Sequence, residues 1–239
     1  MHWTSYNAMS MLLDQIGSAK SVDRENGAKL SVLDVGARIA EINQPTYKTI
    51  IEAKGWNYTG MDIEKGLNVD VVCESPYKFP LEDNSVDIVI SGQVFEHIEF
   101  PWETIKEIYR VLRKDGIAVI IAPSSGAEHR YPFDCFRYYP DGMIALGKWA
   151  GFNSTLARTN WNETKVFGWG DTIGVFLKEA TPVLESSVWS NFSGKNLYGT
   201  WEGNATANLT NWAVFLSKKL AKLPLKPVRL WNKMRSRKN

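Results

Sequence analysis

The sequence predicts an α/β protein that is built on a doubly wound parallel sheet. Between residues 31 and 122, short apolar runs of strand length alternate with helical or connecting segments, which is the pattern of such a sheet. The run 86–91 is typical of strands that a parallel sheet buries on both faces. The 239 residues, 44% hydrophobic and 23% charged, suit one globular α/β domain.

The first elements follow from apolar spacing and glycine stops. Apolar residues recur at helical spacing over 9–16, and Gly17 is expected to end that helix. Residues 18–29 are polar and predict a loop. The run 31–35 predicts a short buried strand that ends at Gly36.

The middle of the chain continues the alternation. A helix is expected over 46–53, with Gly55 as its stop. A second helix is expected to begin at Pro101, since proline suits the first helical position, and to end at Asp115–Gly116. The expected strands of this part are 58–63, 69–72, 86–91 and 117–122.

The pattern changes after residue 140. A helix over 141–150 precedes two strands, 152–158 and 172–178, that are joined by a loop containing tryptophan. The sequence therefore predicts an N-terminal helix and loop, a main domain, an aromatic-rich extension and a basic helical tail. These four parts are expected at 1–29, 30–180, 181–216 and 217–239.

Polar residues follow three of the predicted strands, at the edge where open α/β sheets bind ligands. Gly36 allows a sharp turn and close approach to a ligand just after Asp34. Asp62 ends the next strand, where a carboxylate can accept hydrogen bonds from a ribose diol, and Glu74 follows the third strand. An aspartate at a strand end is more often a cap than a ligand contact, but the ordered set favours a cofactor pocket.

The chain resembles the class I S-adenosylmethionine-dependent methyltransferases over roughly residues 30–180. The segments that carry the resemblance are VLDVGARIAE (32–41), YTGMDI (58–63), VDVVCESPYKFP (69–80), NSVDIVISGQVFEH (84–97) and RVLRKDGIAVIIAP (110–123). The resemblance implies a Rossmann-like, seven-stranded sheet whose last strand is antiparallel. It also implies S-adenosylmethionine as the cofactor.

By this resemblance, Asp34 and Gly36 lie beside the methionine part of the cofactor, Asp62 beside its ribose and Glu74 beside its adenine. The cofactor-binding residues that it implies are Asp34, Gly36, Ala37, Arg38, Asp62, Ile63, Glu74, Ser91, Gly92, Gln93 and His97.

The first loop departs from the family. Arg38 and Ala40 stand where the family usually has a second glycine and often a third. This argues against a dinucleotide enzyme, whose pyrophosphate needs a glycine-rich approach. A cofactor without phosphate tolerates the change, and Arg38 is placed to pair with its methionine carboxylate or to face solvent. The departure also leaves open a pocket that has lost its affinity.

The segment 123–142 begins at the ligand-binding edge of the sheet and is expected to meet the methyl acceptor. Methyl transfer to a hydroxyl needs a base, and His129 is the expected one because a neutral imidazole suits that task. Asp134 is expected to orient His129 or to bind the acceptor hydroxyl. No metal is expected, because no ligand cluster is recognisable in the sequence.

Other side chains of this segment are expected to bind the substrate. Tyr131 and Tyr138 would stack on a sugar ring, and Arg137 would hold an anionic group. In the alternative interpretation the aromatic residues pack a lid, and Asp134 and Arg137 form a structural ion pair.

Two segments in combination, SGQVFEH and HRYPFDCFRYYPDGM, resemble a subgroup associated with bacterial surface-polysaccharide synthesis. This resemblance implies a sugar hydroxyl on a glycan or on a lipid-linked precursor as the acceptor. The alternatives are a small-molecule or RNA O-methyltransferase, and a non-catalytic module that binds glycan. A nucleic-acid amine is disfavoured, because the Asn/Asp/Ser-Pro-Pro-Tyr/Phe signature is absent.

The tail 217–239 holds nine basic residues and no acidic one, interspersed with tryptophan and leucine. This composition favours an anionic membrane surface as its partner, ahead of a plain solvated end or an RNA-binding tail. Cys73 and Cys135 show no disulfide framework, and the start of the chain has no secretory pattern. A cytoplasmic location is expected, with the inner face of the membrane as the place of peripheral binding.

Overall fold

The computed structural model describes residues 3–21, 29–40, 44–160 and 170–179. The chain divides into two units, Met1–Thr200 and Trp201–Asn239, and all described residues belong to the first. The expected extension 181–216 and basic tail 217–239 lie outside the described residues.

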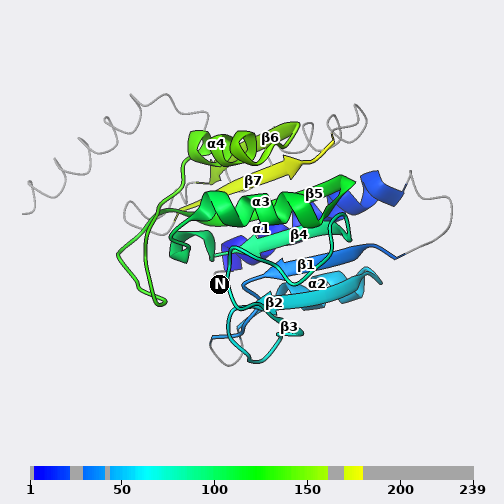
Figure 1. Ribbon diagram of the computed structural model, residues 1–239, viewed down its shortest axis with the longest axis horizontal. Helices are drawn as coiled ribbons and strands as arrows, with labels where there is room; N and C mark the ends of the chain where they lie inside the picture. Colours follow the sequence, from blue (N-terminus) through cyan, green and yellow to red (C-terminus); the bar gives the residue numbers. More distant parts are fainter. Residues whose placement is uncertain (1–2, 22–28, 41–43, 161–169, 180–239) are drawn as a thin grey trace, which may run out of the picture. The chain divides into compact units, whose positions relative to one another are not determined.

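Seven strands of the described chain form one sheet in the order β3-β2-β1-β4-β5-β7-β6 (Figure 1). Strands β1 to β5 run parallel to one another, and β7 is antiparallel to both β5 and β6. The expected seven-stranded sheet with an antiparallel last strand is thus confirmed. The strands are β1 (Ser31–Val35), β2 (Asn57–Asp62), β3 (Val71–Val72), β4 (Val86–Gly92), β5 (Leu112–Ser125), β6 (Ser154–Asn160) and β7 (Gly170–Leu177).

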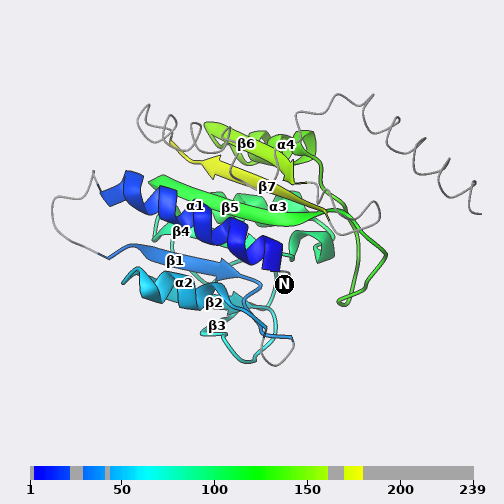
Figure 2. The ribbon, with the colours of Figure 1, turned by 180° about the vertical axis from the view of Figure 1, so that it is seen from behind.

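Helices cover both faces of the sheet (Figures 1 and 2). Along β4, Ile88 and Ile90 pack with α1 and α2, whereas Val89 between them packs with α3 and α4, because successive strand side chains point to opposite faces. No helix of the described segments has the length and apolar character needed to cross a bilayer. The helices are α1 (Trp3–Ser21), α2 (Tyr47–Ala53), the short 3₁₀ helix η1 (Phe95–His97), α3 (Pro101–Val111) and α4 (Pro140–Ala150).

The first helix is longer than its sequence predicted. Gly17 does not end α1, which continues to Ser21. A Cβ atom at Gly17 would lie 2.6 Å from a ring carbon of Trp56. Gly17 therefore lies within the helix and makes room for Trp56 to pack against it. The expected role of Gly17 as a cap is wrong.

The boundary between α3 and β5 also differs from the expectation. The helix ends at Val111, and Gly116 lies within β5 and not at the helix end. The backbone before Ile117 is held in place by tertiary contacts, including a Lys20 Nζ donor 2.7 Å from the carbonyl of Asp115. These partners are distant in sequence, so local spacing gave no sign of them.

Candidate active site

The carboxyl ends of β1, β2, β4 and β5 meet at one edge of the sheet (Figure 1). The strand order reverses direction between β1 and β4, which is where open α/β sheets bind ligands. The loops after these strands carry the residues that the sequence selected, together with the segment 126–139 that follows β5.

The loop after β1 approaches the loop after β4 too closely for a side chain at Gly36. This residue has a φ of +80°, and a Cβ atom there would lie 2.2 Å from Cγ2 of Val94. The backbone N–H groups of Gly36 and Ala37 both donate to the carbonyl of Met61, at 2.8 and 3.1 Å. Glycine at this position thus keeps the ends of β1, β2 and β4 together.

Asp34 lies beneath this loop. It is 3% exposed, and one carboxylate oxygen accepts a hydrogen bond from Tyr58 Oη at 2.8 Å. Burial raises the pKa of Asp34 to about 7, against the lowering effect of that bond. Asn68 donates to both Tyr58 Oη and the carbonyl of Ala37. Asp34 therefore supports the first loop from within.

Asp62 is better placed than Asp34 to meet a ligand. Its two oxygens accept the backbone N–H groups of Arg38 and Glu64, each at 3.1 Å. An ionised carboxylate has about four lone-pair sites, so acceptor capacity remains for a diol. Ile63 and Val72 are each 47% exposed, and the strand register pairs Val72 with Asp62. A diol acceptor beside exposed apolar side chains fits an adenosine group.

Glu74 is exposed in the segment after β3. It follows Cys73, whose N–H donates to the carbonyl of Asp62 at 2.9 Å. The backbone beside Glu74 is thus bonded to that of Asp62, and the adenine contact of Glu74 stays a prediction.

Arg38, at the departure from the family pattern, joins three loops. Its guanidinium forms an ion pair with Glu64 at 3.1 Å and donates to Tyr131 Oη at 2.7 Å. The guanidinium carbon also lies 5.4 Å from the centre of the Tyr131 ring. The guanidinium of Arg38 thus contacts two protein side chains, and its pairing with a ligand carboxylate stays a prediction.

The side chains at the end of β4 form hydrogen bonds with other strands of the sheet. The buried hydroxyl of Ser91 donates to the carbonyl of Val35 at 3.0 Å. Gln93, with a φ of +62°, donates through its side-chain amide to Asp171 on β7 at 2.9 Å. A Cβ atom at Gly92 would lie 2.1 Å from the hydroxyl of Tyr47. The side chains of Ser91 and Gln93 thus fix the strand ends.

Asp134 holds the segment after β5 in shape. It accepts two hydrogen bonds from Arg137, at 2.5 and 2.8 Å, and a third from the backbone N–H of His129 at 2.7 Å. The Arg137 guanidinium holds the pKa of Asp134 well below its usual range. The ring Nδ1 of His129 lies 3.7 Å from Asp134, too far for a hydrogen bond. Asp134 and Arg137 thus form an ion pair, as in the alternative interpretation of the sequence.

Two tyrosines that were expected to bind substrate have different surroundings. Tyr138 is 6% exposed, packs in the core beside Phe95 and donates its hydroxyl to the Phe95 carbonyl at 3.0 Å. It is a core residue, and its expected role in stacking on a sugar is wrong. Tyr131 is 51% exposed and keeps an accessible ring. Sequence alone does not separate the two, because both occur in the same aromatic run.

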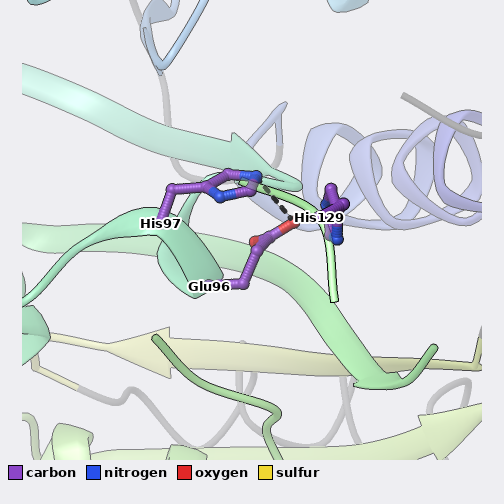
Figure 3. A group of neighbouring side chains, drawn as sticks. All are labelled: Glu96, His97 and His129. Atoms are coloured by element: carbon purple, nitrogen blue, oxygen red, sulfur yellow. Dashed lines mark ion pairs between the residues drawn. The ribbon is translucent and has the colours of Figure 1, made fainter. Parts of the chain in front are cut away.

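Glu96 was not among the site residues that the sequence predicted, yet it lies close to His97 and His129, which were. It is fully buried, and neither of its carboxylate oxygens accepts a hydrogen bond from a described residue. Burial raises the pKa of Glu96 to about 8. Nε2 of His97 is 3.7 Å from Glu96 Oε1, and the rings of His97 and His129 lie 4.9 Å apart, edge to face (Figure 3).

Residues 33–120 match the family model described as a methyltransferase domain. The match spans β1 to β5, in the strand order of the Rossmann-like sheet. This part of the chain is thus similar to a methyltransferase domain. The matched residues include Asp34, Asp62 and Glu96 but stop before His129. The segment 123–142, which the sequence predicted to meet the methyl acceptor, thus lies outside the matched residues.

Curated relatives support the same domain over short segments. An uncharacterized methyltransferase of Mycobacterium ulcerans is 32% identical over 90 residues, covering 36% of this chain and 33% of the relative. One of Schizosaccharomyces pombe is 48% identical over 58 residues, covering 24% of this chain and 23% of the relative. The matches thus span about a third or less of the relatives' length.

Solved structures share the fold of the methyltransferase domain. A putative sarcosine dimethylglycine methyltransferase from Galdieria sulphuraria has a TM-score of 0.51 at 16% identity, covering 71% of this chain and 84% of that chain. The [4+2]-cyclase SpnF has a TM-score of 0.53 at 17% identity, covering 72% and 81%. One fold thus serves proteins named for different reactions, so the acceptor must be argued from the site.

Proposed function

We propose that this chain is an S-adenosylmethionine-dependent methyltransferase that methylates a sugar hydroxyl on a bacterial glycan or its lipid-linked precursor. The observation that carries the cofactor part is Asp62, whose two oxygens are anchored by backbone N–H groups beside exposed Ile63 and Val72. It lies one strand away from the point where the strand order reverses, at the ligand-binding edge.

In such a reaction, each residue at the ligand-binding edge would have a separate role. Bound S-adenosylmethionine supplies an electrophilic methyl group on a sulfonium sulfur. Asp62 would hold the ribose, and the backbone around Gly36 would admit the methionine part. His129 would accept the hydroxyl proton as the acceptor oxygen attacks the methyl carbon. The sulfur keeps the electron pair of the broken bond, and alignment of the three atoms supplies most of the rate enhancement.

A sugar acceptor is supported by the surface of the segment after β5. Tyr131 and Phe133 are 51% and 48% exposed, and both lie in the segment whose sequence resembles the polysaccharide-associated subgroup. Exposed aromatic rings suit stacking on the apolar face of a sugar. A small-molecule or RNA hydroxyl is the alternative acceptor.

A non-catalytic glycan-binding module is the second candidate. The observation that favours it is the contact between Arg38 and Tyr131, which joins the loop after β1 to the acceptor segment. Such a contact would suit a domain whose cofactor loop has lost its ligand and serves to position an aromatic surface.

Calorimetric titration with S-adenosylmethionine separates the two candidates. We expect binding by the full chain, a loss of roughly 100-fold for Asp62→Ala, and no change for Glu103→Gln, whose side chain in the first turn of α3 is 45% exposed. Transfer of labelled methyl to a panel of glycans would then identify the acceptor. No binding at millimolar cofactor would rule out the enzyme in favour of the binding module.

We extend the proposal to the membrane on the sequence of the tail alone, since 217–239 lies outside the described residues. Its nine basic residues would each contribute about 1 kcal/mol at an anionic surface. In sedimentation with anionic vesicles, the full chain should be found in the vesicle pellet and a 1–216 truncation in the supernatant. Equal binding of the two would refute a membrane role for the tail.

A further inference from the structure

Three potential metal ligands meet at the edge of the sheet. Glu96 and His97 come from η1, and His129 comes from the segment after β5 (Figure 3). One ligand atom from each residue lies within 4.8 Å of the other two. The chain thus gathers a carboxylate and two imidazoles from segments far apart in sequence.

The carboxyl group of Glu96 lacks a hydrogen-bond donor among the described residues. It is 0% exposed, and neither oxygen accepts a hydrogen bond from any residue that the structure describes. Its own backbone is fixed, because the Glu96 carbonyl accepts the N–H groups of Cys135 and Phe136 at 2.7 and 3.3 Å. Arg137, in the segment after β5, forms an ion pair with Asp134. A buried carboxylate without hydrogen bonds is costly unless a proton or a cation compensates it, and two imidazoles nearby favour a metal cation.

The imidazole of His97 is oriented as a ligand. Its Nδ1 lies 2.6 Å from the carbonyl of Phe133. A carbonyl only accepts, so Nδ1 carries the proton and the lone pair is on Nε2, which faces Glu96 at 3.7 Å. Metal-binding histidines usually donate their second ring nitrogen to a carbonyl or carboxylate in this way.

We propose that Glu96, His97 and His129 bind a divalent transition-metal ion of the zinc class. Two imidazoles favour such an ion over Mg²⁺ or Ca²⁺, which prefer oxygen ligands. Ligands of a tetrahedral zinc ion are separated by roughly 3.3 Å, since each bond is about 2 Å long. Glu96 and His97 are close to that separation, and a small movement of His129, whose side chain is 40% exposed, completes it.

Three protein ligands leave one position open, as in catalytic zinc sites. This consequence rests on the proposed function: the open position would take the acceptor hydroxyl and lower its pKa, so that its proton passes to water. The oxygen then bonds to the methyl carbon, and the sulfur keeps the electron pair. In this form of the reaction His129 acts as a ligand and not as the base.

Zinc binding to the full chain, first stripped with a chelator, tests the proposal. We expect one Zn²⁺ per chain in calorimetry, and a loss of roughly 100-fold in affinity for Glu96→Gln, His97→Gln and His129→Gln. His2→Gln is the matched control, because His2 is the one histidine of the sequence that the proposed site does not use. That control should bind zinc like the wild type.

A thermal scan guards against variants that fail to fold. Glutamine keeps the shape of Glu96 without its charge, so Glu96→Gln should melt cooperatively without metal. Zinc should raise the Tm of the wild type and His2→Gln but not that of Glu96→Gln. Wild-type affinity in Glu96→Gln, or no stoichiometric binding by the wild type, would overturn the proposal. Neither measurement contains a methyl donor, so the result is independent of the cofactor titration.

Discussion

The two halves of the ligand-binding edge differ in how their carboxylates are satisfied. On the side of β1 and β2, Asp34 has a tyrosine donor and Asp62 has two backbone donors. On the side of β4 and β5, Asp134 is held by Arg137, but the buried oxygens of Glu96 have no hydrogen bond from a described residue, and two imidazoles lie nearby. The carboxylates of the first half are thus held by protein donors, whereas Glu96 in the second half needs a proton or a metal ion to offset its burial.

The largest expected effect is the loss of stability when a side chain is added at Gly36, in the loop after β1. Gly36→Ala places a methyl group against Val94 and forces an alanine into a positive φ, so we expect a destabilisation of roughly 2–4 kcal/mol in urea unfolding. Val94→Ala in the same chain should recover part of that loss. No recovery would mean that backbone strain, and not the contact with the other half, limits this position.

The next effect sharpens the role of Asp62. Asp62→Ala should weaken S-adenosylmethionine binding by about 2–3 kcal/mol, because charge-assisted bonds to the ribose are lost. Asp62→Asn, which keeps an oxygen acceptor for one backbone N–H, should fall between the wild type and alanine. Calorimetric Kd values of equal size for all three proteins would place the ribose elsewhere.

A pH series tests the buried acid of the first half. The folded-state pKa of Asp34 is raised to about 7, so its neutral form is favoured and its contribution to stability is lost as the pH rises from about 4 to 7. Asp34→Asn should therefore gain roughly 2 kcal/mol relative to wild type between pH 5 and pH 8. Urea unfolding at both pH values provides the measurement. A constant difference between the two proteins contradicts a raised pKa.

The smallest effect concerns the contact that joins the halves. Tyr131→Phe removes the hydroxyl that accepts from Arg38 but keeps the ring, so stability should change by less than about 1 kcal/mol. If the contact limits entry to the pocket, the association rate for S-adenosylmethionine should rise in stopped-flow experiments. Tyr139→Phe, another exposed tyrosine of the segment, is the control and should leave that rate unchanged.

The fold could be predicted well because its signals are local. The first strand occupies 31–35 as expected, α3 begins at Pro101, and a hairpin of β6 and β7 follows α4. The failures lie where a partner distant in sequence decides. Gly17 makes room for Trp56, and Asp115 lies inside β5, where its carbonyl accepts a hydrogen bond from Lys20.

The sequence by itself determined the sheet and the polar residues at its edge, because alternation of strands and helices brings parallel strand ends together. Only the tertiary structure decided what those residues touch. It buried Tyr138 and paired Asp134 with Arg137. It also enclosed Glu96 between two histidines. Burial and hydrogen bonding depend on segments that meet in space, and spacing along one chain does not report such meetings.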